Sequence, residues 1–257
     1  MARSALQRSA GAEALRRHDV IDLAPAFTEA DAAALNARFA TTPTREMLAA
    51  MLTELAGRVA VVSSFGAESA VLLHLVAQVD KTVPVIFVNT QKMFGETLAY
   101  RDELAERLGL TDLRVVRPDP YAIAARDKTS LRWSFDPDGC CDIRKVEPLR
   151  RALGPFDAWL SGRKGFQAKT RAALPRFEPD EGKLKLNPLA DWDKAALDAY
   201  FADHDLPRHP LEAQGFASVG CVPCTTTVKP GEDPRSGRWR GWDKTECGIH
   251  GSHDPAF

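Results

Sequence analysis

The strongest constraint on the fold is an alternation of short apolar runs with longer amphipathic segments in the middle of the chain. Four of these runs contain several β-branched residues and predict strands, at residues 59–64, 83–90, 113–118 and 157–162. The segments among them have helical periodicity, at residues 68–79, 96–109 and 143–154. Because continuous apolar strands joined by helices form parallel sheets covered on both faces, the pattern predicts a doubly wound, mostly parallel α/β domain.

The regions on either side of this alternation divide the chain into three expected parts. Residues 1–57 are predicted to form helices that pack on the core. Residues 58–205 are expected to form a nucleotide-binding α/β domain. Residues 206–257 lose the periodicity and are rich in Pro, Gly, Cys, Arg and Trp, so we expect a mobile C-terminal segment with a functional role.

Local signals refine these parts. The spacing of Thr28 and Asp31 resembles a capping box at the start of an N-terminal helix, and a second helix is predicted over residues 43–57. The run at residues 183–188, KLKLNP, predicts a strand at the edge of the sheet, and residues 193–204 predict one more helix.

Charge and composition limit the partners of the chain. Lys and Arg number 34 and Asp and Glu number 35, so no overall field attracts nucleic acid or membrane, and any anion site must be built locally. No apolar run approaches the length of a membrane span. The segment MARSALQRSAGAEALRR lacks the apolar core of a secretory signal, although its composition leaves a transit peptide open. We therefore expect a cytoplasmic protein with no nucleic-acid or membrane partner.

The first predicted strand ends in SSFGAES and runs directly into a helix. Ser63, Ser64 and Ser69 supply hydroxyls, Gly66 lets the backbone approach closely, and the helix N-terminus supplies free N–H groups. This combination predicts an anion cradle at the carboxyl end of the strand, although the heptapeptide fits neither the Walker nor the GxGxxG pattern. A serine-capped helix start without a ligand is the alternative interpretation.

The five cysteines are grouped rather than scattered. Cys140 and Cys141 are adjacent, Cys221 and Cys224 form a CxxC, and Cys247 stands alone. An odd count in a reducing compartment does not indicate a disulfide framework. Four thiolates suit zinc or an iron–sulfur cluster, but adjacent ligands are awkward around one small ion, whereas a [4Fe-4S] cube offers them separate irons. A zinc-binding module, in which these cysteines only staple the fold, remains an alternative.

Two motifs resemble known families. SSFGAES is similar to the modified phosphate loop of the adenine-nucleotide α-hydrolase-like superfamily, which includes ATP pyrophosphatases, tRNA thiolases and the adenylyl-sulfate and phosphoadenylyl-sulfate reductases. GCCDIRKVEPLR together with VGCVPCTT resembles the assimilatory, thioredoxin-dependent adenylyl-sulfate reductases, over about residues 59–250. That resemblance implies a [4Fe-4S] cluster on the four paired cysteines. The near-zero net charge argues against the tRNA thiolase alternative, which would need a basic surface.

The resemblance also implies a set of substrate-binding residues. Val88, Asn89 and Thr90 stand where those reductases contact adenine and ribose, and Lys145 stands between cluster and substrate. In the segment SGRKGFQAKTR, the resemblance assigns substrate binding to Gly162, Arg163 and Arg171. Lys164 stands where the family usually has a second arginine, and it has no assigned role. The segment DPRSGRW carries over Arg235 and Arg238. Planar guanidinium groups suit a sulfate–phosphate anhydride, although exposed arginines in a disordered tail are the alternative.

The segment ECGIH near the C-terminus matches the Glu-Cys-Gly-Leu-His of this family, with Ile249 as a conservative departure, and implies that Cys247 is the nucleophile. Arg235, Arg238 and His250 are expected to favour its thiolate form and to bind the sulfuryl oxygens. An S-sulfocysteine would then have to leave the pocket, which a mobile tail anchored by Trp239, Trp242 or the arginines would permit.

The resemblance predicts the reduction of adenylyl sulfate to sulfite and AMP, with thioredoxin as electron donor, in sulfate assimilation. A phosphoadenylyl-sulfate reductase or an enzyme of dual specificity is the nearest alternative, and we expect a preference for adenylyl sulfate because no cation site for a 3′-phosphate can be assigned. The sequence is compatible with a homo-oligomer but does not define one.

Overall fold

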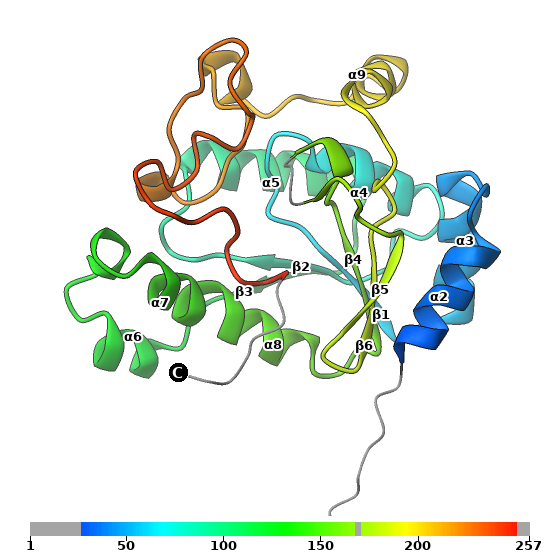
Figure 1. Cartoon of the computed structure of the whole chain (residues 1–257), viewed down its shortest axis with the longest axis horizontal. Coiled ribbons are helices and arrows are strands. Elements are labelled where there is room, and N and C mark those ends of the chain that lie inside the picture. Colours follow the sequence, from blue (N-terminus) through cyan, green and yellow to red (C-terminus); the bar gives the residue numbers. More distant parts are fainter. Residues whose placement is uncertain (1–26, 168–170, 251–257) are drawn as a thin grey trace, which may run out of the picture.

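The computed structural model describes residues 27–167 and 171–250, and its centre is a sheet with helices on both faces (Figure 1). Within these residues the sheet has six strands in the order β3-β2-β1-β4-β6-β5. The strands are β1 (Val59–Val62), β2 (Val85–Val88), β3 (Leu113–Val116), β4 (Ala158–Ser161), β5 (Phe177–Asp180) and β6 (Lys183–Leu186). All neighbouring pairs are parallel except β5 with β6. The predicted doubly wound, mostly parallel α/β fold is therefore confirmed.

The helices form one layer on each face of the sheet (Figure 1). They are α2 (Glu29–Arg38), α3 (Thr44–Glu54), α4 (Ser69–Ala77), α5 (Gly95–Leu108), α6 (Pro120–Arg126), α7 (Pro137–Cys141), α8 (Glu147–Leu153) and α9 (Lys194–Asp203). Alternate residues of β1 serve the two layers: Val59 and Val61 belong to the larger core with α4 and α5, and Ala60 belongs to the smaller core with α8. Burial on both faces explains why the strands are continuously apolar.

Helix α2 lies beside β5, which is the strand at one edge of the sheet. The predicted capping box is present: Thr28 N–H donates to Asp31 Oδ2 at 2.8 Å and Asp31 N–H donates to Thr28 Oγ1 at 3.3 Å. The side chain of Asn36 in α2 bonds both the N–H and the carbonyl of Phe177 in β5. Residues 1–26 of the expected N-terminal part, Ala168, Lys169 and Thr170 of the arginine-bearing segment, and residues 251–257 of the tail lie outside the described residues.

The prediction that residues 183–188 form the edge of the sheet was wrong. Strand β6 pairs with β4 on one side and with β5 on the other, so β5 is the edge strand. Residues 177–180, FEPD, carry no strand pattern, and Pro179 removes a backbone donor. A proline is tolerated at a sheet edge because no further strand needs its missing N–H.

A buried ion pair fixes the segment that carries the adjacent cysteines. The chain passes from α7 into a π-helical turn, Asp142–Val146, and then into α8. Within the turn, Arg144 Nη2 lies 2.6 Å from Asp127 Oδ2, with 3% and 0% of the two side chains exposed. Arg144 also donates to the carbonyl of Thr90, which follows β2. The pair therefore joins the cysteine segment to the carboxyl end of the sheet.

We predict that Asp127→Asn lowers the free energy of unfolding by about 3–5 kcal/mol, because it leaves a buried guanidinium without its countercharge. The matched control is Asp157→Asn, which breaks an exposed pair with Arg58 and should cost less than about 1 kcal/mol. Urea unfolding of both variants checks the prediction. Equal losses would contradict the assigned importance of the buried pair.

Candidate active site

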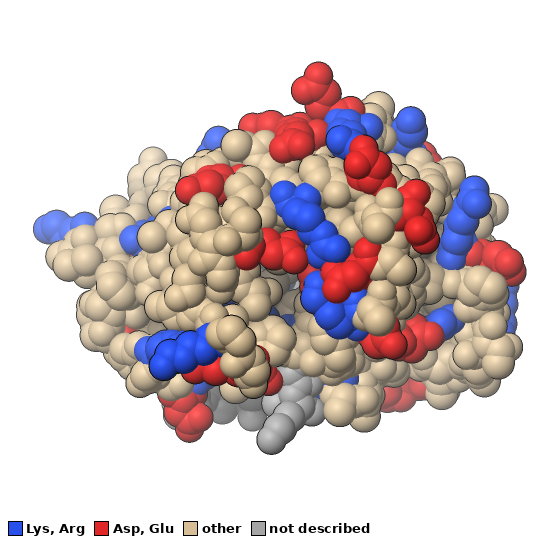
Figure 2. All heavy atoms as spheres, turned by 90° about the horizontal axis from the view of Figure 1, so that it is seen from above, with Lys and Arg blue, Asp and Glu red and all other residues tan. Residues whose placement is uncertain are grey.

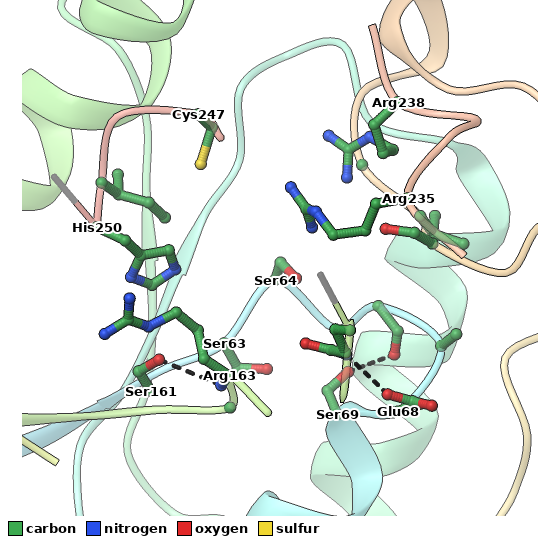
Figure 3. Close-up of a pocket in the computed structure, with 18 of the residues that line it drawn as sticks. Ser63, Ser64, Glu68, Ser69, Ser161, Arg163, Arg235, Arg238, Cys247 and His250 are labelled. Atoms are coloured by element: carbon green, nitrogen blue, oxygen red, sulfur yellow. Dashed lines mark hydrogen bonds between the residues drawn. The ribbon is translucent and has the colours of Figure 1, made fainter. Parts of the chain in front are cut away.

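A cavity lies at the carboxyl ends of β1 and β4, covered by the C-terminal segment (Figure 3). It has a volume of about 210 Å³. All the predicted substrate-binding residues except Asn89 line it, namely Ser63, Ser64, Gly66, Ser69, Val88, Thr90, Lys145, Gly162, Arg163, Arg171, Arg235, Arg238 and His250, together with Cys247. Asn89 instead accepts a hydrogen bond from the N–H of Gln91 at 2.9 Å. The fold thus brings six segments that are distant in the sequence to one place.

The loop after β1 has the form expected of an anion cradle. Ser63 Oγ accepts the N–H of Phe65 at 3.1 Å, and Phe65 has a φ of +48°, so the backbone turns sharply before α4. Ser69 opens α4 and donates to the carbonyl of Gly66 at 2.5 Å. The first turn of α4 therefore begins at the wall of the cavity, where its free N–H groups can meet an anion.

Two cations from the loop after β4 are buried with carboxylate partners. Arg163 pairs with Glu178 and donates to Asn187 Oδ1 at 3.3 Å. Lys164, whose role the sequence left open, has its Nζ 3.1 Å from Glu68 Oε2 and only 3% of its side chain exposed. Burial lowers the pKa of both groups, to about 10 for Arg163. Glu68 was missed by the sequence reasoning although it lies within SSFGAES.

A second carboxylate holds the arginines nearest the reactive tail. Glu246 accepts from Arg171 Nε at 2.7 Å and from Arg171 Nη2 at 2.8 Å, and also from Arg235 Nη2 at 3.2 Å. Burial lowers the pKa of Arg235 to about 10, although the charge of Glu246 acts in the opposite direction. The sequence reasoning did not assign Glu246 a role, although it is the first residue of ECGIH.

The ring of Trp239 organises the opposite wall. Four cations lie within 5.9 Å of the ring centroid, belonging to Lys145, Arg235, Arg238 and Lys244. The negative face of an indole lowers the mutual repulsion of such a group. Trp239 is 3% exposed, whereas Trp242 is 45% exposed. Of the two tryptophans predicted as tail anchors, Trp239 lines the cavity and Trp242 does not, and the anchoring role stays a prediction for both.

Cys247 and His250 enter the cavity from the tail, and the sulfur of Cys247 points toward the space between the arginines and the serine loop (Figure 3). The ring of His250 stacks on Trp159 with centroids 5.7 Å apart and planes inclined by 13°. Burial, and then the charges of Lys185 and Arg163, hold the pKa of His250 well below its usual range. These effects favour the neutral form of the His250 imidazole, and the expected influence of His250 on the Cys247 thiolate stays a prediction.

The four paired cysteines lie behind this wall as free thiols. Cys140 and Cys141 end α7, and Cys221 and Cys224 flank a short 3-10 turn, with Cys221 Sγ 3.2 Å from Thr90 Oγ1. Burial raises the pKa of Cys140 to about 11, and the negative charges of Cys221 and Cys224 contribute to the rise. The charges of Cys221 and Cys224 therefore act on the other cysteine pair, at Cys140. No three His, Cys, Asp or Glu side chains among residues 27–167 and 171–250 form a group that could hold a metal ion.

Lys145 connects the thiols with the cavity. It lines the cavity, and its pKa, which burial would lower, is raised overall by the charges of Cys221, Cys247 and Cys141. The pKa of Cys221 shows the reciprocal effect: burial would raise it, but Lys145, the hydrogen bond from Thr90 and Arg238 outweigh burial and lower it. The charges of Cys221, Cys141 and Cys247 thus favour the protonated form of Lys145.

Three buried polar atoms at this cavity lack a hydrogen-bond partner within the described residues: Arg235 Nε, Trp239 Nε1 and His250 Nδ1. The first two are donors, and the neutral imidazole can donate or accept. An orphaned buried donor costs roughly 1–3 kcal/mol, so this wall favours a ligand with several acceptor oxygens. The fold and the site define a class of protein, an α/β nucleotide-type binding protein whose anion pocket faces a thiol.

Comparison with known proteins defines the family. Residues 58–227 match the phosphoadenosine phosphosulfate reductase domain. The chain is 50% identical over 233 residues to an adenosine 5′-phosphosulfate reductase of Chelativorans, which covers 88% of this chain and 93% of the relative. A second adenosine 5′-phosphosulfate reductase, from Mesorhizobium japonicum, is 54% identical over 192 residues, which are 75% of this chain and 76% of the relative. The chain therefore belongs to the phosphoadenosine phosphosulfate reductase family, as its motifs predicted.

Solved structures agree with this assignment. The phosphoadenylyl-sulfate reductase of Candida auris, solved as a phosphate complex, aligns with a TM-score of 0.66 and 26% identity over 79% of this chain and 98% of that chain. Yeast FAD synthetase aligns with a TM-score of 0.52 at 18% identity, over 78% of this chain and 69% of that chain, and shows the fold alone.

Gly220 offers a test of the cationic wall. A Cβ at this position would overlap the guanidinium of Arg238, which is flexible enough to move away, whereas a Cβ at Gly95 would meet nothing within 4 Å. We predict that Gly220→Ala weakens sulfate binding about tenfold, the effect of losing one charge-assisted hydrogen bond of about 1.5 kcal/mol. Isothermal titration calorimetry, with Gly95→Ala as the control, checks this. Unchanged sulfate affinity would remove Arg238 from the anion site.

Proposed function

We propose that this chain is an adenylyl-sulfate reductase that forms sulfite and AMP through an S-sulfo intermediate on Cys247. The observation that carries the proposal is the position of the Cys247 thiol, in one cavity with the serine loop after β1 and the four arginines. Such a cavity suits a nucleotide that ends in an anionic, electrophilic sulfur. The names of the relatives support the same substrate class.

The first step is attack by the Cys247 thiolate on the sulfur of the substrate. The bond between Sγ and that sulfur forms as the sulfur–oxygen bond to the phosphate breaks, and the electron pair leaves with AMP. Lys145, Arg235 and Arg238 line the cavity as cations that can stabilise the thiolate and the sulfuryl oxygens. His250 also lines the cavity, and its Nδ1, which has no partner among the described residues, can form a hydrogen bond with a sulfuryl oxygen.

The departing phosphate needs a second group of donors. Ser63, Ser64 and Ser69 and the N-terminus of α4 line the cavity on the side of β1, and they suit the phosphate of AMP. Val88 and Thr90 at the end of β2 extend this wall toward the nucleoside. Asn89 does not line the cavity and is not part of the proposed contact.

In the second step a thioredoxin thiolate attacks Cys247 Sγ. The bond to the sulfo group breaks with its electron pair on sulfite, and the second thioredoxin thiol resolves the mixed disulfide. The two electrons therefore come from the thioredoxin dithiol. Because a protein cannot reach a thiol inside this cavity, we propose that the tail segment carrying Cys247 moves outward between the steps. The five cysteines form no disulfide within the described residues, which suits the reducing cytoplasm that we propose as the location of the protein.

The paired cysteines fit a [4Fe-4S] cluster by their chemistry. Four buried or half-buried thiols come from two segments; burial raises the pKa of Cys140, Cys141 and Cys224, whereas Lys145 and its neighbours lower the pKa of Cys221. Such a group is stable as thiolates only with metal cations among it. The cluster would supply bound iron that holds the two segments together and adds to the electrostatics of the pocket. The reaction itself passes its electrons between thiols.

We propose adenylyl sulfate rather than its 3′-phosphorylated form as the preferred substrate. The relatives at 54% and 50% identity carry the name adenosine 5′-phosphosulfate reductase, whereas a phosphoadenosine 5′-phosphosulfate reductase of Gloeobacter violaceus is 43% identical over 194 residues. That relative covers 73% of this chain and 80% of its own length.

The decisive experiment measures sulfite release with both nucleotides in a thioredoxin-coupled assay. We predict a higher kcat/KM for adenylyl sulfate, and no sulfite from Cys247→Ser although this variant still binds the nucleotide. Without thioredoxin, the wild-type peptide that contains Cys247 should gain the mass of one SO₃ group. An adduct on another residue, or normal turnover by Cys247→Ser, would contradict the mechanism.

The metal centre is tested separately. Anaerobically purified protein should be brown, and Cys224→Ser should lose iron, because one thiolate ligand is missing. Iron and acid-labile sulfide are measured, with Cys247→Ser as the matched control that keeps all four proposed ligands. Full iron in Cys224→Ser, or a colourless zinc protein, would refute the cluster.

A further inference from the structure

Glu246, the residue before Cys247, occupies two arginines of the anion pocket. Its carboxylate makes a bidentate contact with Arg171 at 2.7 and 2.8 Å and a third contact with Arg235 at 3.2 Å. The side chains of Arg171, Glu246 and Arg235 are 7%, 28% and 16% exposed, so these contacts are only partly screened by water. The Glu246 carboxylate therefore binds two of the guanidinium groups that we propose bind the ligand.

No other carboxylate pairs with these two arginines among the described residues. Their remaining contacts are neutral: Arg171 Nη1 donates to Gln167 Oε1 at 2.8 Å, and Arg235 Nη2 donates to the carbonyl of Thr245 at 2.8 Å. Both arginines line the cavity together with Cys247. A phosphate or sulfate group in that cavity must therefore compete with Glu246 for the same donors.

We propose that Glu246 is a positioning residue, which holds Cys247 over the pocket by its contacts with Arg171 and Arg235. When the ligand binds, its anionic group replaces the Glu246 carboxylate as the partner of these two arginines. This inference rests on the proposed function in assigning Cys247 and an anionic nucleotide to the site. Ligand binding thereby loosens the segment that must later carry the sulfo group outward.

Other contacts keep the tail near the pocket when Glu246 is displaced. On one side of Cys247, Lys244 pairs with Asp138 in α7. On the other side, Ile249 packs against the smaller hydrophobic core and His250 stacks on Trp159. Neither set involves Arg171 or Arg235, so displacement of Glu246 frees the middle of the segment while both flanks stay attached.

The test is Glu246→Gln, which keeps the shape of the side chain and removes its charge. We expect it to bind AMP about fivefold more tightly than wild type, because the arginines lose their competing carboxylate, an effect of about 1 kcal/mol. We expect iodoacetamide to alkylate Cys247 about fivefold faster, because the segment is less firmly held. Calorimetry measures the affinity, and peptide mass spectrometry measures the alkylation rate.

Two further variants make the result specific. Glu181→Gln, which neutralises an exposed acid paired with Arg150, should leave both quantities unchanged. Glu246→Asp keeps the charge on a shorter side chain, should give intermediate values, and serves as the test if Glu246→Gln does not fold. An unchanged affinity or an unchanged alkylation rate in the folded variant would overturn the proposal. Failure of wild type to bind AMP would instead count against the proposed function.

Discussion

The concentration of positive charge in one partly buried pocket is the constraint on which the rest of the site depends. Arg163, Arg171, Arg235, Arg238 and Lys145 all line the same cavity. Burial, together with repulsion from neighbouring cations, lowers the pKa of Arg163 and Arg235 to about 10. The ligand-free protein must compensate these charges until an anion arrives, and it does so with carboxylates and with the face of Trp239.

The carboxylates that compensate these cations, Glu178, Glu68 and Glu246, belong to different parts of the fold. Glu178 lies on the rigid edge strand and Glu68 lies beside the first turn of α4, so Arg163 and Lys164 are held by the frame of the domain. Glu246 belongs to the tail that also bears Cys247. Over the whole sequence the charges nearly cancel, and Lys and Arg side chains lie beside Asp and Glu side chains on the face in Figure 2. The field that attracts an anion is therefore local to the pocket, not global.

The sequence predicted the frame well because each of its signals is local. The apolar runs gave four of the six strands in a parallel arrangement, and Thr28 and Asp31 gave the capping box. Strand β5 was not predicted because FEPD has no apolar alternation. Its pairing with β6 depends on the neighbouring strand rather than on its own residues. The helices of residues 27–167 and 171–250 include none with the length and apolar character of a membrane span.

The sequence by itself determined the fold class, the serine loop after β1, the grouping of the cysteines and the family, because these depend on residues close together in the chain. Only the tertiary structure decided that Asn89 is absent from the cavity lining, that the ring of His250 stacks on Trp159 with its pKa lowered by burial, and that Glu246 pairs with Arg171 and Arg235. Arg171 and Glu246 are 75 positions apart in the chain, and their pairing follows from folding. Charge state and pairing depend on burial and on distance in space, which no local pattern of residues encodes.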